Sequence, residues 1–421
     1  MRQNADQKPA AGLRGLKVLD FTWAGAGPFA AQILGLMGAD VVKVESSARP
    51  DLLRIADIAY GWGQGSIDAS TCFNDMNAGK RSIELDLKHP QGRAVALRLA
   101  ARADVICDNM RPGKMEALGM GFDAIRKINP GVVCASVSAT GRLSGGEPAD
   151  VPGYAPVFWA EGGAAAVTGF SDGEPAYLRA PVDMNAGAFA ALGMLAALYA
   201  RQRSGEGAYV DCSAIETVTA LVGDRLLAAS LGQPTAGRRG NDREPFAPND
   251  VFPCAEPDSW IAISVFDADQ WRALCRVLDC DLLAADPALR SRLARWQRRA
   301  EIYDALATAT RRCPVPVLEA GLLAAGVPAA RCNPISVLLQ HPALLERGFW
   351  KDVDHPLIGR QRIGSLAFRT QPPLADPPRG GPLLGEHGSE VLEDWLGLSP
   401  LDVASLAEAG ALKLATIEQE T

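Results

Sequence analysis

The stretch from Leu16 to Glu45 constrains the fold more than any other part of the sequence. Leu16 to Phe21 is an apolar run typical of a buried strand, and a glycine-rich turn at residues 23–28 follows it. Phe29 to Met37 has helical spacing, and residues 40–45 form a second apolar strand. A strand, a helix and a second strand in this order form a βαβ unit, which requires parallel strands. The chain is therefore predicted to build a parallel sheet covered by helices.

Later segments repeat this pattern. A helix is expected to open at Pro90, because proline is favoured in the first helical turn, and the small-residue run from Ala188 to Ala200 is typical of a buried helix. With the first two strands, about six strands alternate with helices, which predicts an α/β fold with a doubly wound sheet. The further predicted strands are Arg81–Leu87, Asp104–Cys107, Gly131–Ser138 and Ala208–Cys212.

The chain is predicted to divide into a large domain (1–231), a linker with a small α+β domain (232–334) and a C-terminal segment (335–421). Residues 232–256 are rich in Pro, Arg and Asn, as linkers and surface arms are. The small domain begins with a predicted strand at Trp260–Val265. Residues 46–79 are expected to be irregular. In the C-terminal segment, strands are predicted at Gly348–Val353 and Gly364–Phe368, and helices at Ser389–Leu396 and Pro400–Ala409.

Composition excludes several classes of protein. The net charge of −7, without a basic run, argues against binding to nucleic acid or to anionic membranes. The nine cysteines form no CxxC pair, which favours a reducing cytoplasm, and the four histidines lack the spacing of a zinc site, so no metal is expected. The N-terminus, Met1 to Gly12, is polar, unlike a signal peptide. The longest apolar run, Ala186 to Ala200, is shorter than the ~18–20 residues of a membrane span.

Asp183 stands in the stretch Ala180–Gly187, immediately before the long small-residue run. A carboxylate at the start of a helix lies near free backbone N–H groups and the positive end of the helix dipole, which keeps it ionised. Those conditions suit a nucleophile. They equally suit an N-cap, since aspartate is a favoured cap residue. The stretch alone leaves both interpretations open.

Two loops at predicted strand ends are candidate ligand sites. In the first, Gly25, Gly27 and Ala30 fit the pattern GxGxxA, and Glu45 could bind a ribose hydroxyl as in dinucleotide-binding folds. Pro28 weakens this match, because it removes a backbone N–H where a pyrophosphate needs donors. The glycines could equally serve only to make a tight turn. The second loop is Asp108–Gly113, at the carboxyl end of a predicted parallel strand, where α/β sheets bind ligands.

Seven segments occur in an order that is shared with a known family. They are residues 15–45, 79–93, 103–130, 162–170, 180–187, 205–216 and 382–392, and they include GLKVLDFTWAGAGPFAAQILGLMGADVVKVE, GKRSIELDLKHPQGR, APVDMNAG and PLLGEHGSEVL. Together they resemble the class III CoA-transferase family, which contains formyl-CoA transferase, carnitine CoA-transferase and α-methylacyl-CoA racemase. The resemblance extends from Gly12 to Leu412.

The resemblance implies a set of site residues. Asp183 matches the nucleophilic aspartate of the family. The backbone N–H groups of Gly25–Gly27 are plausible oxyanion donors. Two basic positions of the family are Ser46 and Ala117 here, so the phosphates are expected to contact Arg49, Arg54 or Lys88 instead. The family's CoA contacts fall on Gly25, Ala26, Leu85, Asp86, Leu87, Lys88, Asn109, Met110, Arg111 and Tyr154.

The resemblance also implies the assembly. Family members are interlocked dimers, in which each chain has a Rossmann-like large domain made from both ends of the sequence and a small domain between them. A homodimer is therefore expected, and a heteromer with a related subunit is the alternative. Residues 335–421 are expected to return to the large domain.

The implied activity is transfer of CoA from an acyl-CoA donor, succinyl-CoA or acetyl-CoA, to a free carboxylic acid through an aspartyl-CoA thioester on Asp183. CoA is then part of the substrates, and no permanent cofactor is expected. One alternative is racemisation of a 2-methylacyl-CoA, but Tyr154 stands where the racemases have histidine, and a tyrosine is a poor base at neutral pH. Another alternative is a binding subunit of a heteromer, which the presence of Asp183 disfavours.

The acceptor is predicted to be larger than oxalate: aromatic or branched, and possibly dicarboxylic. Gly25 stands where formyl-CoA transferase has a glutamine, and with Gly27 it leaves room for a bulky acid. Trp23 or Trp159 could stack on that acid. Arg238, Arg239 and Arg243 could hold a second carboxylate, although a solvated cluster of charges is the other reading. Asn185 could orient Asp183, or could simply be an exposed residue of a helical turn.

Overall fold

The chain folds into two compact units. The computed structural model describes residues 12–59, 65–142, 153–235 and 237–415. The large unit comprises Met1–Ala165, Tyr177–Pro234 and Leu345–Thr421, and the small unit comprises Ala166–Ala176 and Thr235–Leu344. Residues 1–11, which form most of the polar N-terminus, and residues 143–152 of the loop before Tyr154 lie outside the described residues.

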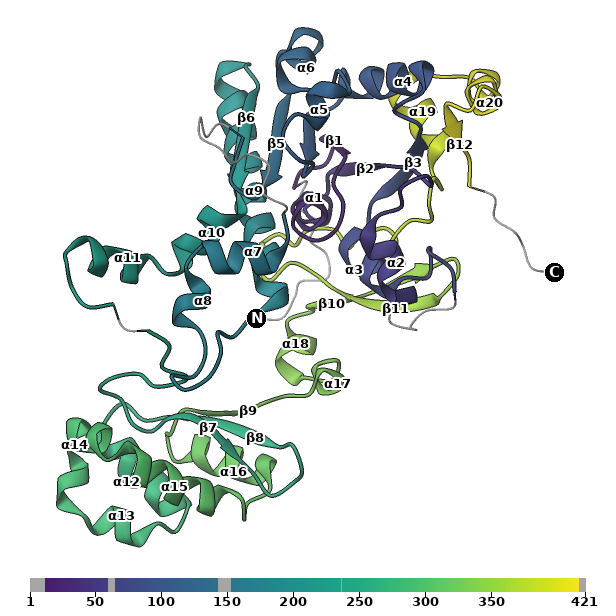
Figure 1. Ribbon diagram of the computed structural model, residues 1–421. Coiled ribbons are helices and arrows are strands. Elements are labelled where there is room, and N and C mark those ends of the chain that lie inside the picture. The colour runs from purple at the N-terminus through teal and green to yellow at the C-terminus, as the bar shows by residue number, and fades with distance from the viewer. Residues whose placement is uncertain (1–11, 60–64, 143–152, 236, 416–421) are drawn as a thin grey trace. The chain divides into compact units, whose positions relative to one another are not determined.

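A seven-stranded sheet forms the centre of the large unit, in the order β12-β3-β2-β1-β4-β5-β6 (Figure 1). β1 to β6 pair in parallel, as the alternation of strands and helices predicts, and β12 pairs antiparallel with β3 at the edge. The order reverses between β1 and β4, and open α/β sheets bind ligands at such a switch point. The strands are β1 (Lys17–Asp20), β2 (Asp40–Glu45), β3 (Arg81–Leu85), β4 (Val105–Asp108), β5 (Val133–Ser138), β6 (Ala208–Ser213) and β12 (Leu412–Lys413).

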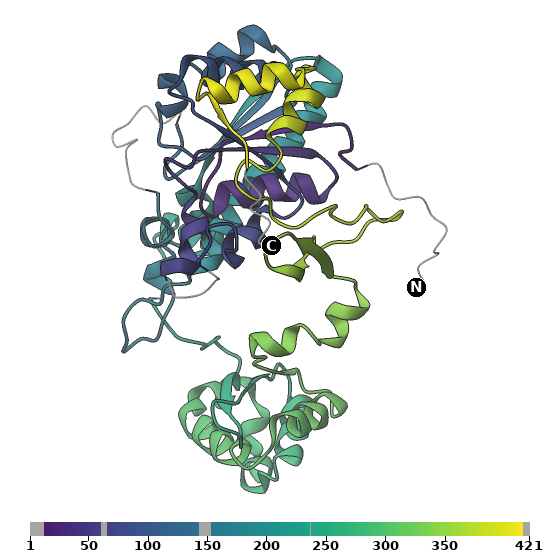
Figure 2. The same ribbon diagram turned by 90° about the vertical axis from the view of Figure 1, so that its right-hand side faces the viewer.

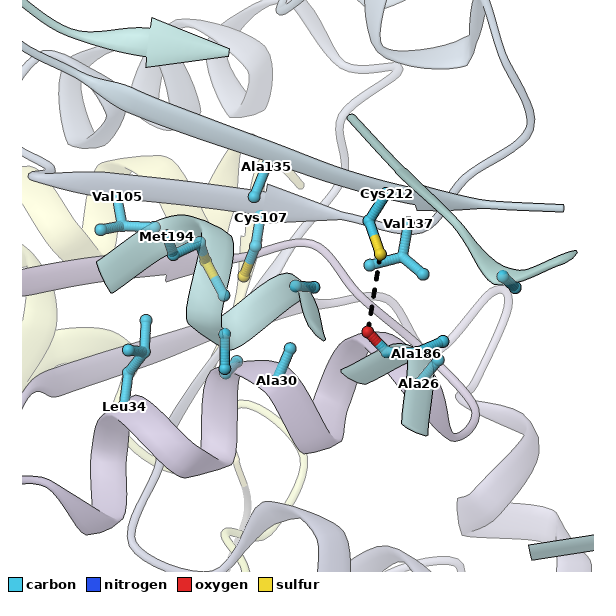
Figure 3. Close-up of a cluster of buried hydrophobic side chains, with 14 of the residues drawn as sticks. Ala26, Ala30, Leu34, Val105, Cys107, Ala135, Val137, Ala186, Met194 and Cys212 are labelled. Atoms are coloured by element: carbon cyan, nitrogen blue, oxygen red, sulfur yellow. Dashed lines mark hydrogen bonds between the residues drawn. The ribbon is translucent and has the colours of Figure 1, made fainter. Parts of the chain in front are cut away.

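Successive residues of each strand supply opposite faces of the sheet, so the large unit has two cores. Val18 lies in the first core and Leu19 in the second, and Val105 and Ile106 alternate in the same way. Helices α1 (Ala26–Leu36) and α9 (Arg179–Ser204) pack together over the first face, where Ala30, Leu34, Ala186 and Met194 meet the strands (Figure 3). Small residues between α1 and α9 allow the two helices to approach closely. A Cβ on Gly187, for example, would lie 2.5 Å from the carbonyl oxygen of Ala26.

The remaining helices of the N-terminal half follow from local signals. Pro90 occupies the first turn of α4 with His89 as its cap, and Ser70 caps α3. The described part of the region 46–79, predicted to be irregular, contains the helices α2 and α3, so that prediction was wrong. These elements are α2 (Leu52–Ala59), α3 (Thr71–Asn77), α4 (Pro90–Ala100), α5 (Lys114–Ala117), α6 (Phe122–Ile128), α7 (Ala155–Glu161), α8 (Ala164–Val167), α10 (Ala214–Leu221) and α11 (Gly223–Ser230).

Helix α9 begins earlier than the sequence indicates. Its N-cap is Leu178, so Asp183 is the fifth residue of the helix and the N-cap interpretation of Asp183 was wrong. The residues Pro181–Ser204 are long and apolar enough to cross a membrane. A single such helix is weak support for a membrane span, because core helices of soluble proteins have the same character.

The C-terminal segment packs on the large sheet. Arg81 of β3 binds Asp40 at 2.6 Å, Asp394 at 2.7 Å and Glu390 at 3.1 Å, and the indole of Trp395 donates to Asp40 at 2.8 Å. Figure 2 shows the two terminal helices, in yellow, beside the sheet. A capping box formed by Ser399 and Asp402 starts the second of them. These helices are α19 (Gly388–Leu396) and α20 (Pro400–Glu408).

The small unit is a three-stranded antiparallel sheet covered by helices around its own apolar core. Its buried Arg295 donates to the carbonyl oxygens of Ala247 at 2.8 Å and Leu289 at 2.9 Å. Strand β7 lies inside the stretch predicted as a linker. The elements are β7 (Asn249–Pro253), β8 (Trp260–Ser264), α12 (Ala268–Val277), α13 (Asp281–Ala285), η1 (Pro287–Arg290), α14 (Arg292–Gln297), α15 (Arg299–Thr310), α16 (Val315–Ala324), β9 (Ala329–Arg331) and α17 (Ile335–Leu338).

A hairpin connects the small unit to the C-terminal helices. Helix α18 (Pro342–Glu346) leads into the antiparallel strands β10 (Trp350–His355) and β11 (Gly359–Gly364). The strand predicted at Gly364–Phe368 was therefore misplaced, since the second strand of the hairpin ends where the prediction begins.

Candidate active site

The glycine turn between β1 and α1 is held by the loop that follows β4. Asn109 accepts a hydrogen bond from the backbone N–H of Trp23 at 2.9 Å and donates one to the carbonyl oxygen of Trp23 at 2.7 Å. The side-chain amide thus pairs with Trp23 as a neighbouring backbone would. Because β1 and β4 are adjacent at the switch point, this contact places the two predicted ligand loops side by side.

Buried charges hold the same turn from the other side. Asp51 accepts a hydrogen bond from the backbone N–H of Ala24 at 2.9 Å. Ala24 has a φ of 61°, a backbone conformation that residues other than glycine rarely adopt. Lys43 pairs with Asp51 at 3.0 Å and donates to the carbonyl oxygen of Thr22 at 2.6 Å. Burial lowers the pKa of Lys43, but Asp51, Asp20 and other carboxylates outweigh it and raise that pKa, so Lys43 stays charged.

A second buried pair lies beneath the first helical turn of α1. Lys80 pairs with Asp20 at 2.8 Å and donates to the carbonyl oxygen of Pro28 at 2.9 Å. Burial raises the pKa of Asp20, but Lys80 and Lys43 outweigh it, and the resulting pKa is below the ordinary value. Both pairs are inaccessible to solvent, so we assign them to positioning the turn rather than to contact with a ligand.

Asp183 faces the start of α1. A Cβ on Gly25 would lie 2.5 Å from Oδ2 of Asp183 and 2.9 Å from its Cγ, so the carboxylate rests against the Cα of this glycine. Gly25 is the N-cap residue of α1, which has neither a side-chain cap nor an acidic residue in its first turn. The carboxylate of Asp183 therefore lies at the positive end of the α1 dipole, where a negative charge is stabilised.

Several predicted residues meet at this point. A Cβ on Gly27 would lie 2.5 Å from Cβ of Thr22 and 2.9 Å from Cγ of Asn109, so only glycine fits there. Asn185, a candidate for orienting Asp183, instead donates to the carbonyl oxygen of Thr217 at 2.9 Å and anchors α9 on α10. The structure thus brings together Trp23, Gly25, Ala26, Gly27, Asn109 and Asp183.

Other predicted contacts lie along the same edge of the sheet or inside the cores. Leu85 is buried in the second core, whereas Asp86 and Lys88 are exposed just beyond β3. Leu87 and Met110 are partly buried and pack against the second core, and Arg111 is exposed. Tyr154 is 59% exposed at the start of α7, but Trp159 is only 7% exposed and belongs to the first core. In this chain the ring of Trp159 is thus packed against protein.

Two proposed roles at the end of β2 do not fit the geometry. Arg54 is fully buried, binds Glu45 at 2.7 Å and Asp68 at 2.6 Å, and stacks on the ring of Phe73. Arg54 is therefore not exposed to bind a phosphate, and Glu45, which it engages with two hydrogen bonds, is not open to a ribose hydroxyl. By contrast, Arg49 is exposed and its guanidinium lies 4.4 Å from the centre of the Trp23 ring.

The arginines considered for a second carboxylate have local partners in the small unit. Arg238 donates to the carbonyl oxygen of Gly173 at 2.8 Å, and Arg239 lies 3.7 Å from Glu244. Arg243 lies 5.5 Å from the ring of Phe246. The interpretation as a solvated cluster accounts for all three.

Sequence reasoning missed the supporting charges. Asp51 and Lys43 stabilise the glycine turn, and Arg142 binds the carbonyl oxygen of Met110 in the loop after β4. The one visible signal was a charged residue inside an apolar strand, as in DVVKVE. Among the described residues, no group of three or more His, Cys, Asp and Glu side chains is arranged to hold a metal ion.

Comparisons with known proteins assign the family. The model of CoA-transferase family III matches residues 13–388. The chain is 33% identical to a succinyl-CoA–D-citramalate CoA-transferase of Chloroflexus aurantiacus, over 96% of this chain and 98% of that protein. It is 34% identical to a succinyl-CoA:mesaconate CoA-transferase of Haloarcula hispanica, over 90% and 95%. A crystal structure of a CAIB/BAIF family protein from Brucella suis superposes with a TM-score of 0.82 at 28% identity, over 91% and 99%. The chain therefore belongs to CoA-transferase family III and is a class III CoA-transferase.

Proposed function

We propose that this enzyme moves CoA from succinyl-CoA to a dicarboxylic acid larger than oxalate, through a thioester formed on Asp183. The observation that carries the proposal is the position of the Asp183 carboxylate against Gly25, at the uncapped start of α1. There a nucleophile and backbone N–H groups at the head of a helix meet in one place, which is what acyl transfer through an oxyanion requires.

The proposed reaction needs only the Asp183 carboxylate and the two substrates. The Asp183 carboxylate attacks the thioester carbonyl, which gives a mixed anhydride and CoA thiolate. The thiolate attacks the aspartyl carbonyl, which releases the donor acid and leaves an aspartyl-CoA thioester. The acceptor carboxylate attacks this thioester, breaks its C–S bond and forms a second mixed anhydride with release of CoA thiolate. The thiolate then attacks the acceptor carbonyl and displaces the Asp183 carboxylate. The new acyl-CoA leaves, and Asp183 is a carboxylate again.

The N–H groups of Ala26 and Gly27 are the proposed oxyanion donors. They occupy the first two positions of α1, where helix geometry provides no intrahelical acceptor for an N–H group. Pro28 has no N–H, so the donors of this first turn are confined to the two residues nearest Gly25.

The choice of substrates rests on the relatives. The two named above carry succinyl-CoA in their names, and their acceptors, D-citramalate and mesaconate, each contain two carboxylates. The exposed guanidinium of Arg49, beside Trp23 in the glycine turn, offers a cation to an anionic substrate. Arg49 and Lys88 remain the proposed contacts for the phosphates of CoA.

A racemase is the weaker alternative. That reaction needs a base beside the α-carbon of the acyl group, and the residue at the corresponding position is Tyr154. The four histidines lie elsewhere in the chain, before α4 and α18, in β10, and before α19. None of them is on the elements that position Asp183.

Turnover with a panel of acids tests the proposal. Succinyl-CoA is incubated with branched and unbranched dicarboxylic acids, aromatic acids, formate and oxalate, and the products are separated by liquid chromatography with mass spectrometry. We expect new acyl-CoA thioesters from branched dicarboxylic acids. Reaction with formate and oxalate alone would overturn the choice of substrate. Exchange of the α-proton of a 2-methylacyl-CoA in deuterated water, without transfer, would favour the racemase.

We also propose that the enzyme is a homodimer. The outer face of α9 carries Phe189, Leu192 and Tyr199, which are 45%, 62% and 67% exposed, and α11 adds Leu226 and Leu227 at 50% and 63%. Exposed apolar side chains on these two helices of the large unit favour a partner surface of the same kind. The family's dimers make a second copy of this chain the proposed partner.

Leu192→Glu is expected to disrupt that dimer, because it places a charge in the centre of the apolar face. The mass in solution is measured by light scattering after gel filtration, together with the melting temperature. The control is Leu401→Glu, which changes the same kind of residue, 83% exposed on α20. A Leu192→Glu protein as dimeric and as heat-stable as the Leu401→Glu control would contradict the proposed interface.

A further inference from the structure

Arg142 joins the carboxyl-terminal halves of three neighbouring strands. Its guanidinium donates to Asp108 at the end of β4 at 2.6 Å and to Ser136 of β5 at 2.6 Å. Its backbone N–H donates to Asp211 of β6 at 2.7 Å. The guanidinium also lies 3.3 Å from the carboxylate of Glu116 on α5. The side chain is only 8% exposed, so this is a built arrangement rather than a solvated arginine.

The same guanidinium reaches the loop that carries Asn109. It donates to the carbonyl oxygen of Met110 at 3.3 Å, and the N–H of Met110 donates to the same Asp108 oxygen at 3.1 Å. Arg142 therefore binds the residues on both sides of Asn109. Asn109 in turn makes both hydrogen bonds to the backbone of Trp23, two residues before Gly25. A continuous series of contacts leads from Arg142 to the glycine against which Asp183 rests.

We propose that Arg142 is a positioning residue for catalysis: it holds the Asp108–Met110 loop so that Asn109 keeps the glycine turn in place for CoA and for Asp183. This inference rests on the proposed function, because it assumes that the glycine turn is part of the CoA site. Arg142 itself contacts neither Asp183 nor the glycine turn among the described contacts.

An arginine suits this role because of its shape. Its planar group carries five N–H donors in a fixed fork, and here they serve acceptors on α5, β4, β5 and the loop after β4 at once. Lysine offers a single point charge and glutamine offers a single amide, so neither can bind all of these acceptors. Loss of the guanidinium would leave Asp108 buried with the Ser136 hydroxyl and the Met110 N–H as its donors among the described residues.

Titration of Asp108 gives the proposal a pH signature. Burial raises the pKa of Asp108 to about 6, although Arg142 opposes the shift. Below that pH the carboxyl is neutral and the ion pair with Arg142 is lost, so the KM for acyl-CoA is expected to rise as pH falls through about 6. The charged and titratable groups that face Asp108 are Arg142, Glu116, Cys107, Cys134 and Tyr209.

Acid weakens the contact between Asp108 and Arg142, but it has the opposite effect on the contribution of Asp108 to the stability of the fold. Because its pKa in the folded protein is above the ordinary 3.8, ionised Asp108 destabilises the fold. That destabilisation is complete above about pH 6 and disappears as pH falls toward the unfolded value. Acid therefore removes the free-energy cost of burying a charged Asp108, while it weakens the contact that holds the loop. A rise of KM in acid without a loss of stability is thus the mark of a positioning effect rather than of general unfolding.

The matched control is Arg201. It forms the same kind of pair at the opposite end of β4, where it binds Asp104 at 2.9 Å and donates to the carbonyl oxygen of Gly131 at 3.0 Å. Arg201 thus links the β4 and β5 regions as Arg142 does, but away from the ligand loops. Variants Arg142→Gln, Arg142→Lys and Arg201→Gln are compared for kcat, KM and melting temperature. The double variant Asp108→Asn/Arg142→Gln removes the unpaired charge in case Arg142→Gln folds poorly.

We expect Arg142→Gln to raise the KM for acyl-CoA about tenfold, with a smaller fall in kcat, and to move the acid limb of the KM profile to higher pH. Arg142→Lys should recover only part of this loss, and the double variant should keep the raised KM. Arg201→Gln should change the melting temperature while leaving KM unchanged. A KM that changes equally in Arg142→Gln and Arg201→Gln would show that Arg142 is merely structural and overturn the proposal.

Hydrogen–deuterium exchange tests the positioning without turnover, so it stands even if the proposed function fails. Arg142→Gln is expected to speed exchange in the peptides that cover residues 20–27 and 108–113, because the Trp23 N–H depends on Asn109. Arg201→Gln should leave both peptides protected as in the wild type. Unchanged exchange at residues 20–27 in Arg142→Gln would overturn the positioning role. Failure of the wild type to transfer CoA would instead count against the proposed function.

Discussion

Asp183→Asn is expected to lower kcat for CoA transfer by at least about 10⁴-fold, because the amide keeps the size of the side chain but removes the nucleophile. The protein should still fold, since Asp183 is partly exposed on α9 and its neighbours Val182 and Ala186 supply the buried contacts. Steady-state transfer from succinyl-CoA, with circular dichroism as a check on folding, measures the effect.

Asp224→Asn is the control for this experiment. Asp224 lies in the first turn of α11, and its side chain is 77% exposed. We expect it to keep wild-type kcat within about twofold, as surface substitutions generally do. Turnover by Asp183→Asn that is comparable to this control would mean that the carboxylate is not the nucleophile, whatever the family resemblance implies.

Gly25→Ala is expected to reduce kcat about 100-fold or more, because displacement of a reacting group by about 1 Å has effects of this size. The backbone of Gly25, with φ −98° and ψ −71°, accepts alanine without strain. The added Cβ, however, would lie 2.5 Å from Oδ2 of Asp183, so the carboxylate must move. The effect should therefore fall on catalysis, with a small change in melting temperature.

Gly223→Ala provides the comparison. Gly223 is the first residue of α11, and a Cβ there would meet no atom within 4 Å. This variant should be as active and at least as stable as the wild type, because alanine favours helix. If Gly25→Ala were fully active, Asp183 would not need its place beside Gly25, and the site assembled around that contact would be wrong.

The positions of the parallel strands could be predicted because burial on both faces leaves a strong mark on the sequence. DVVKVE carries three valines and GVVCASVS is mostly apolar, and β2 and β5 lie within those segments. The start of α9 could not be predicted in the same way. Pro181 and the polar residues around it resemble a helix boundary, yet proline is tolerated in a first turn, and the helix begins at Arg179.

The residues around Asp183 illustrate a second limit. The two glycines of the turn are visible in the sequence. Glycine is required there because a Cβ would meet Asp183 or Asn109, which are distant along the chain. Buried ion pairs such as Lys43–Asp51 likewise join residues whose proximity only the fold decides. Trp159 shows the converse, because an aromatic residue that could stack on a ligand equally suits a core.

Trapping of the intermediate tests the central claim most directly. The wild-type protein is mixed with succinyl-CoA and other acyl-CoAs, treated with hydroxylamine, and digested for peptide mapping by mass spectrometry. Hydroxylamine attacks an aspartyl thioester and releases CoA, so the account predicts a hydroxamate on Asp183 that Asp183→Asn lacks. Transfer of CoA by the wild type with no modification of Asp183, or with the label on another residue, would contradict it.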